Sequence, residues 1–242
     1  MIDELLPPPL AVADTRHDRP DSVLYPAEAR TVAGAVDERR REFATVRFCA
    51  RQALRDLGVA PAPILNGERG APVWPAGTIG SMTHCRGYRA AAVAYATELA
   101  TIGIDAEPDL PIRDEGTREL VMVAEERARV AALTARHPEV AWDRLVFSAK
   151  ESVYKAWYPL TGRWMDFHEA VVTVDPDRGA FHARLLVPGP EIGGRRVGTF
   201  QGGWLRRDGI LLTAIALTRT GVDSTRPFPF AGRPATTVSG TR

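Results

Sequence analysis

The sequence predicts an α+β fold, in which helices pack against small antiparallel sheets. Two segments, residues 28–57 and 142–157, repeat apolar side chains at the helical period, and Gly58 supplies the expected stop after the first. Two others, residues 89–104 and 199–217, each consist of two apolar runs joined by a short turn, a pattern typical of β-hairpins. Each half of the chain therefore offers helices and a small antiparallel sheet.

Composition is that of an ordinary globular protein, with 242 residues, 45% of them hydrophobic, so the chain is long enough to bury a substantial core. The net charge of +1 provides no overall basic field for nucleic acid, so any anion must be bound by a local patch. Only Cys49 and Cys85 occur, and they have no CxxC spacing. This argues against a disulfide framework and a structural zinc site.

The N-terminus is acidic and interrupted by prolines, whereas a signal peptide needs a basic start and a continuous apolar segment. No apolar run reaches the length of a membrane span. We expect a monomeric cytoplasmic protein that binds neither nucleic acid nor membrane.

The remaining elements alternate in the same way along the chain. Residues up to about Tyr25 predict an irregular arm, because prolines and charges are mixed there. The other expected elements are a strand over 79–85, a helix over 119–136 and strands over 171–174 and 181–187. The expected divisions are an N-terminal half over 1–108, a C-terminal half over 109–219 and a mobile tail over 220–242, which has too few apolar residues to fold.

One arginine lies in the middle of the apolar face of the first long helix. Arg39 shares this face with Phe43, and Arg47 lies on its shoulder. An arginine in such a place either extends its charged end outward along the apolar stem or binds an anion. Guanidinium groups bind phosphate oxygens in pairs, so the second reading is a phosphate clamp.

A pair of acids, Asp105 and Glu107, ends a short apolar run. Residues two apart on a strand point to the same face, so these carboxylates repel each other unless they lie in open solvent or around a cation. Oxygen ligands alone suit magnesium better than zinc.

The second long helix carries Glu151 and Lys155 opposite its apolar face. One reading is a solvated ion pair one helical turn apart. Phe147 and Tyr154 flank Glu151, however, and a merely solvated face seldom carries two aromatic residues beside its charges. These charges are therefore expected to line a cleft.

Three ordered motifs resemble the Sfp-type 4′-phosphopantetheinyl transferase superfamily. They are Trp74-Pro75 with residues 80–85, then Gly103-Ile104-Asp105-Ala106-Glu107, then Phe147-Ser148-Ala149-Lys150-Glu151-Ser152-Val153-Tyr154-Lys155-Ala156. The resemblance implies a pseudo-dimer of two similar α+β halves with the active site between them. It also implies magnesium-dependent transfer of 4′-phosphopantetheine from coenzyme A to a serine of an apo carrier protein.

The resemblance assigns roles to individual residues. Ala106 stands where some relatives have a third acid, so water is expected to complete the metal site. The implied residues are Asp105, Glu107 and Glu151 for Mg²⁺, with Mn²⁺ as an alternative ion; Arg39, Arg47, Arg69, Thr83, His84, Asp105, Lys150 and Lys155 for coenzyme A; and Glu151 and Lys150 for catalysis.

Two other functions compete with this one. A metal-dependent phosphodiesterase or nuclease could use the same three acids, but it would need a basic track that the balanced charge does not offer. A non-catalytic module that binds coenzyme A or a carrier protein would not need to keep three acids and both lysines. The sequence does not indicate whether the carrier belongs to a fatty acid, polyketide or peptide synthase.

Overall fold

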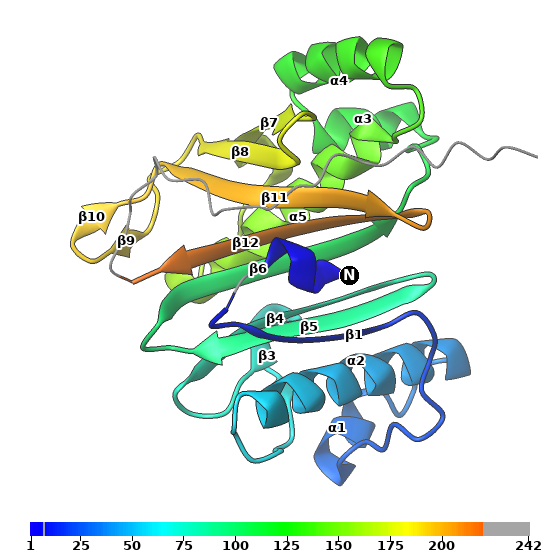
Figure 1. Cartoon of the computed structure of the whole chain (residues 1–242), viewed down its shortest axis with the longest axis vertical. Helices are drawn as coiled ribbons and strands as arrows, with labels where there is room; N and C mark the ends of the chain where they lie inside the picture. Colours follow the sequence, from blue (N-terminus) through cyan, green and yellow to red (C-terminus); the bar gives the residue numbers. More distant parts are fainter. Residues whose placement is uncertain (7, 220–242) are drawn as a thin grey trace, which may run out of the picture.

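The computed structural model describes residues 1–6 and 8–219, which form two main antiparallel sheets covered by helices, together with two small two-stranded sheets (Figure 1). Helices and strands mix in both halves of the chain, so the α+β prediction with two similar halves is confirmed. The tail expected over residues 220–242 lies outside the described part. Within that part, no helix combines the length and apolar character needed to cross a membrane.

The first half packs its longer helix against a three-stranded sheet. Ala50, Ala53 and Leu54 of the longer helix pack on Ala91 and Val93 of the central strand. The elements are η1 (Ile2–Leu5), β1 (Ala11–Thr15), α1 (Pro26–Thr31), α2 (Asp37–Asp56), β2 (Leu65–Asn66), η2 (Glu68–Gly70), β3 (Pro72–Val73), β4 (Thr78–Cys85) and β5 (Tyr88–Tyr95), with the main sheet in the order β1-β5-β4.

The second half contains a five-stranded sheet with α5 packed on it. Trp157, Val153 and Ala149 of that helix lie in a core shared with Phe181 and Phe200 of the sheet. The elements are β6 (Leu99–Pro108), α3 (Glu115–Val121), α4 (Ala124–Arg136), α5 (Trp142–Thr161), η3 (Phe167–Glu169), β7 (Ala170–Asp175), β8 (Ala180–Leu185), β9 (Glu191–Ile192), β10 (Arg195–Arg196), β11 (Thr199–Arg207) and β12 (Ile210–Thr218), with the sheet in the order β6-β12-β11-β8-β7.

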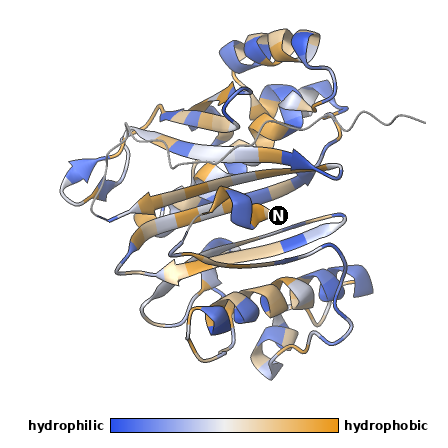
Figure 2. Cartoon of the chain, in the orientation of Figure 1, coloured by the Kyte–Doolittle hydropathy of each residue, from blue (hydrophilic) through white to orange (hydrophobic). Residues whose placement is uncertain are grey.

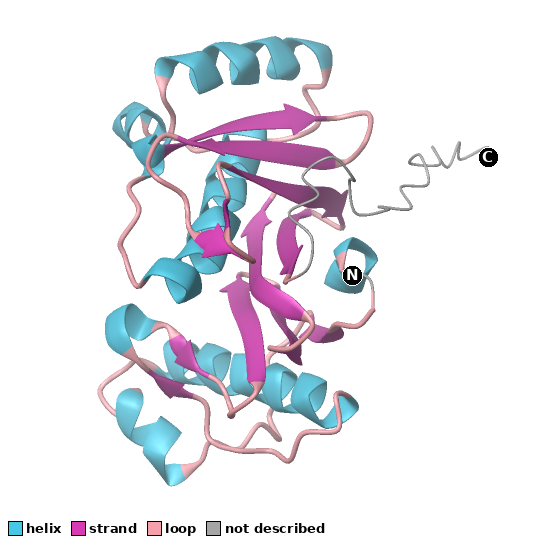
Figure 3. Ribbon diagram, turned by 90° about the vertical axis from the view of Figure 1, so that its left-hand side faces the viewer, coloured by secondary structure: helices cyan, strands magenta, loops and turns pink. Residues whose placement is uncertain are grey.

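The strands of both halves meet in the middle of the molecule, with α1 and α2 at one end and α4 at the other (Figure 3). These strands carry long apolar stretches, which Figure 2 shows in orange. Small residues line both faces of β5: Ala90, Ala92 and Ala94 face the second half, and Ala91 faces α2. Their size lets the layers approach closely.

The hairpin expected within residues 89–104 does not form. Both strands exist, but β5 pairs with β4 and β1, whereas β6 crosses to the other sheet and pairs with β12 along its whole length. The chain therefore crosses from the three-stranded to the five-stranded sheet between β5 and β6. A local turn pattern could not reveal this, because β12 lies more than a hundred residues away in sequence.

The long helix expected from Glu28 is also divided. α1 ends at Thr31, and α2 begins at Asp37 with Val36 as its N-cap. Although Val36 has the helical spacing of the apolar face that includes Phe43, it is 72% exposed and lies outside that face, whereas Gly58 does adopt the positive φ expected after the helix. Arg39 consequently lies on the open first turns of α2.

Gly103 allows α5 to lie directly on β6. A Cβ atom at this position would be 2.0 Å from the carbonyl oxygen of Ser152 and 2.9 Å from the amide nitrogen of Ala156, distances that real contacts do not reach. The Thr101 hydroxyl donates to the carbonyl of Ala156 at 2.7 Å in the same contact. The glycine therefore sets how closely the helix that carries Glu151 approaches the strand that carries Asp105.

We predict that Gly103→Ala lowers the free energy of unfolding by about 1–3 kcal/mol, because backbone atoms must move apart to admit the new methyl group. Urea denaturation measures the loss. Gly34→Ala is the matched control, since no atom lies within 4 Å of its added Cβ, and it should change stability by less than about 1 kcal/mol. Equal effects of the two substitutions would contradict a special role for Gly103.

Candidate active site between the two halves

A cavity of about 480 Å³ lies where the two halves meet. One wall comes from α2, η2 and β4, and the other comes from β6 and α5. The cavity brings together six of the residues expected from the sequence: Arg39, Arg47, Arg69, His84, Glu151 and Lys155. Its remaining lining is largely apolar and aromatic, including Phe43, Trp74, Tyr154 and Tyr158.

Asp105 is held beside this cavity by three side chains. Its Oδ1 accepts hydrogen bonds from Lys155 Nζ at 2.7 Å and from Thr83 Oγ1 at 3.1 Å, and its Oδ2 accepts from Ser148 Oγ at 2.8 Å. Lys155 Nζ also donates to the carbonyl of Ile104 at 3.1 Å. Only 5% of Asp105 is exposed, so these donors stabilise a buried charge.

The other two acids lie close enough to influence Asp105 and each other. Burial, reinforced by the charge of Asp105, raises the pKa of Glu107 to about 7, although Arg144 Nη1 lies 3.3 Å from its carboxylate. Burial also raises the pKa of Glu151, an effect that Lys155 opposes and Asp105 reinforces. A cation placed among the three carboxylates would relieve this repulsion.

The donors suit magnesium in kind, because all three are carboxylates and Mg²⁺ prefers oxygen ligands. Among residues 1–6 and 8–219, however, no three His, Cys, Asp or Glu side chains are gathered into a ready-made metal cluster. Lys155 already occupies Asp105 Oδ1, and Arg144 pairs with Glu107. The residues therefore fit the ion chemically, while their side chains must turn toward one another to hold it.

The opposite wall presents Arg39 and His84. Arg39 Nη1 is in close contact with His84 Nε2, and the Arg39 side chain is 48% exposed. Burial, followed by the charges of Arg39 and Lys155, lowers the pKa of His84 to about 4, so its imidazole is neutral at pH 7. Because His84 is neutral and the Arg39 guanidinium is exposed, this wall of the cavity can accept the negative charge of a phosphate.

Arg47 and Arg69 line the same cavity in different ways. The Arg47 guanidinium stacks 3.2 Å from the centre of the Phe43 ring and donates to the carbonyl of Ile64 and to the side chain of Asn66. Burial lowers its pKa to about 10. Arg69 is exposed and lies over Trp164 at 5.7 Å, so it is the freer of the two arginines.

Lys150 does not lie where the sequence led us to expect. The residue is 3% exposed, and its ammonium group forms an ion pair with the fully buried Glu126 at 2.7 Å and donates to the carbonyls of Val121 and Phe167. These three acceptors use all three N–H groups, so Lys150 cannot contact a phosphate in this arrangement. Lys150 therefore connects α5 to α3, α4 and η3 and fixes the part of α5 that carries Glu151.

Thr83 also differs from its expected role. Its hydroxyl donates to Asp105 and accepts a hydrogen bond from the amide of Ala106 at 3.1 Å, so it faces β6 and not the cavity. Its neighbour His84 points the other way, as alternation along a strand requires. Thr83 thus positions Asp105, whereas His84 lines the cavity and remains the residue of this pair that is expected to contact phosphates.

Sequence reasoning missed Ser148, which belongs to a polar stripe on α5. Ser148, Glu151, Ser152 and Lys155 have the spacing i, i+3, i+4 and i+7, which places all four on one helical face. Ser148 contacts Asp105, and both serines contact the hydroxyl of Thr213 on β12. This spacing was a signal in the sequence that the face meets a polar partner.

Two family models match successive parts of the chain. The 4′-phosphopantetheinyl transferase N-terminal domain matches residues 27–94, and the 4′-phosphopantetheinyl transferase superfamily model matches residues 101–192. The border between them falls between β5 and β6, where the chain crosses from one sheet to the other.

Individual proteins are similar over nearly the whole chain. The 4′-phosphopantetheinyl transferase Svp of Streptomyces mobaraensis is 53% identical over 98% of this chain and 97% of its own. The 4′-phosphopantetheinyl transferase Npt of Nocardia iowensis is 46% identical over 89% of this chain and 99% of its own. The 4′-phosphopantetheinyl transferase PptT of Mycobacterium tuberculosis is 44% identical over 86% of this chain and 92% of its own.

The buried position of Lys150 generates a stability prediction. Lys150→Met should lower the free energy of unfolding by about 3–5 kcal/mol, because the buried Glu126 carboxylate then loses its cationic partner and keeps only the amide hydrogen bonds from Val123 and Val172. Adding Glu126→Gln should recover part of the loss, since the amide is neutral. Denaturant unfolding of the two single variants and the double variant measures both effects.

Lys155→Met is the matched control, because its ammonium lies on the same helix and its side chain is 27% exposed. It should cost less stability than Lys150→Met. If Lys150→Met unfolds like the unaltered protein but loses coenzyme A binding, the structural role given to Lys150 is wrong.

Proposed function

The chain belongs to the 4′-phosphopantetheinyl transferase superfamily, and we propose that it uses the cavity between its halves to transfer the 4′-phosphopantetheine arm of coenzyme A to a serine of an apo carrier protein. The observation that carries this proposal is the meeting of two walls. One wall presents Arg39, Arg47 and His84, and the other presents Glu151 and Lys155 beside Asp105. Cationic and phosphate-binding groups thus face acids across one cavity.

Coenzyme A supplies the phosphates that such a cavity needs. The Arg39 side chain is 48% exposed, so the guanidinium N–H groups that do not contact His84 can donate to phosphate oxygens, as can those of Arg69 at the rim. The largely apolar lining around Tyr154 and Tyr158 suits the uncharged pantetheine arm. Arg47 contributes its charge to the wall while its hydrogen bonds hold Ile64 and Asn66.

Magnesium is part of the proposal, held by Asp105, Glu107 and Glu151, with Mn²⁺ as an alternative ion. When bound, it would neutralise the pyrophosphate and stabilise the charge that develops on the leaving phosphate. An ion held by Asp105 would take the place of the Lys155 ammonium there and would leave Lys155 available to a phosphate oxygen.

The reaction breaks one phosphoanhydride bond. The serine hydroxyl of the carrier attacks the β-phosphate of coenzyme A, a new P–O bond forms to the serine oxygen, and 3′,5′-adenosine bisphosphate leaves with the electron pair of the broken bond. Glu151 accepts the serine proton, a role for which burial suits it by raising its pKa. Lys155 and Arg39 balance charge on the phosphates.

The transfer assay tests this function. The protein is incubated with coenzyme A, Mg²⁺ and a panel of apo carriers from fatty acid, polyketide and peptide synthases, and each carrier is weighed by mass spectrometry. One or more carriers should gain about 340 Da, the mass of the phosphopantetheine arm, and chelation of the metal should prevent it. Binding of coenzyme A without modification of any carrier would favour a binding module, and hydrolysis of a phosphodiester would favour the nuclease alternative.

Glu151→Gln should reduce turnover about 100-fold or more while folding is preserved, because the amide lacks the charge and basicity of the acid. Glu98→Gln, an exposed position away from the cavity, is the control. Recovery at high Mg²⁺ would mean that Glu151 mainly holds the ion, and a persistent loss would mean that it accepts the proton. Unchanged turnover at limiting Mg²⁺ would contradict both roles.

A further inference from the structure

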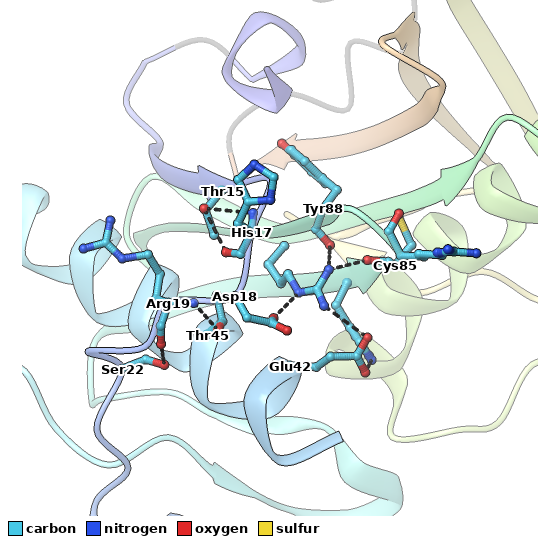
Figure 4. Close-up of polar contacts among 12 residues, drawn as sticks. Thr15, His17, Asp18, Arg19, Ser22, Glu42, Thr45, Cys85 and Tyr88 are labelled. Carbon is cyan, nitrogen blue, oxygen red and sulfur yellow. Dashed lines mark hydrogen bonds and ion pairs between the residues drawn. The ribbon is translucent and has the colours of Figure 1, made fainter. Parts of the chain in front are cut away.

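A second cluster of charges lies behind the arginine and histidine wall of the cavity. Its centre is Arg89 at the start of β5, which is 6% exposed. Asp18, Glu42 and Cys85 converge on this guanidinium from three different segments (Figure 4). None of these four residues lines the cavity, and none was given a role in the active site from the sequence.

Arg89 is fixed from several sides. Its Nη1 donates to the carbonyl of Cys85 at 2.7 Å, and its Nε lies 2.8 Å from Asp18 Oδ1. The latter two atoms form an ion pair without the alignment of a hydrogen bond. A guanidinium held by β4 and by the irregular segment before α1 has little freedom to move, so it is a rigid anchor for its third partner.

That third partner is Glu42 on α2. Its Oε1 lies 3.3 Å from Arg89 Nη2, while its Oε2 lies 3.6 Å from His84 Nε2 and 3.7 Å from Arg39 Nη1. One oxygen of the Glu42 carboxylate therefore faces the buried Arg89, and the other faces both Arg39 and His84. The Glu42 side chain is 17% exposed, so solvent screens these contacts only in part.

Arg39 depends more than Arg47 on a partner such as Glu42 to fix its side chain. It lies on the first turns of α2, and its side chain is 48% exposed, whereas Arg47 is stacked on Phe43 and bonded to Ile64. A free arginine side chain loses rotamer entropy when it is ordered by a ligand. A side chain already directed toward the cavity loses less of this on binding.

We infer that Glu42 is a positioning residue, which is anchored by the buried Arg89 and directs Arg39 and His84 toward a phosphate group of the substrate. This inference rests on the proposed function, since it assumes that these two residues receive a phosphate of coenzyme A. It deepens that function by extending the phosphate wall to a residue that does not touch the ligand.

A purely structural role makes a different claim. In that case Glu42 only neutralises Arg89, and its loss would lower stability while the remaining protein bound coenzyme A normally. Glu42→Gln separates the roles, because the amide oxygen still accepts from Arg89 while the negative charge facing Arg39 and His84 is removed. Glu42→Asp keeps the charge and withdraws it by one methylene group. Glu38→Gln, on the same helix and exposed, is the matched control.

The experiment is a double-variant cycle on the full chain, with coenzyme A affinity measured by titration calorimetry and KM and kcat by the transfer assay. Glu42→Gln should raise both Kd and KM for coenzyme A about fivefold to tenfold and leave kcat within about twofold. In an Arg39→Met background the same change should alter Kd less than about twofold, because the residue through which Glu42 acts is absent. Glu38→Gln should alter neither constant.

Several results would overturn the inference. An unchanged Kd in Glu42→Gln, or an equal rise with and without Arg39, would show that Glu42 does not act through that arginine. If Glu42→Gln proves unstable on thermal melting, Glu42→Asp gives the same test and should also raise Kd, since position matters as well as charge. Should Arg39→Met itself bind coenzyme A normally, the binding mode under the proposed function is wrong as well, whereas an Arg39 effect without a Glu42 effect contradicts only the positioning role.

Discussion

The contact of α5 with β6 at Gly103 is the constraint on which the rest of the site depends. Because no side chain separates the two backbones there, Ser148 and Lys155 of the helix reach Asp105 of the strand within hydrogen-bond distance. Burial is the main cause of the raised pKa of Glu151, and the same closeness adds the effect of the Asp105 charge to it. The distances among Asp105, Glu151 and Lys155 are therefore determined by a backbone contact between α5 and β6 that is buried inside the protein.

The two halves are joined across β6 by side chains and not by a continuous sheet. One edge of β6 pairs with β12, while on the other edge the amide of Ile104 donates to the hydroxyl of Ser81 at 3.1 Å and the amide of Ala106 donates to that of Thr83. Two hydroxyls on β4 thus replace part of a backbone ladder. This arrangement leaves the walls free to diverge into a cavity, and it explains why Thr83 belongs to the support of Asp105.

Much of the architecture was predictable, because it depends on local patterns. The helix stop at Gly58, the hairpin of β11 and β12 and the three ordered motifs all lie within short stretches of sequence. The predictions that failed involve partners distant in sequence: β6 pairs with β12 and not with β5, and Lys150 forms a buried ion pair with Glu126. Lys150 and Glu151 are adjacent in one motif, but Lys150 points into the protein and Glu151 points to the cavity. Helical spacing alone does not predict this difference, because it does not show which elements pack against each face of the helix.

The central claim is that the face shared by β6 and α5 receives the pyrophosphate of coenzyme A. The most direct test is ³¹P NMR of coenzyme A bound to the protein, with Mn²⁺ in place of Mg²⁺, because a paramagnetic ion broadens the signals of nearby phosphorus atoms. The account predicts that the two pyrophosphate signals broaden strongly and the 3′-phosphate signal much less, and that the difference is lost in Asp105→Asn. Equal broadening of all three signals, or strongest broadening of the 3′-phosphate, would contradict it.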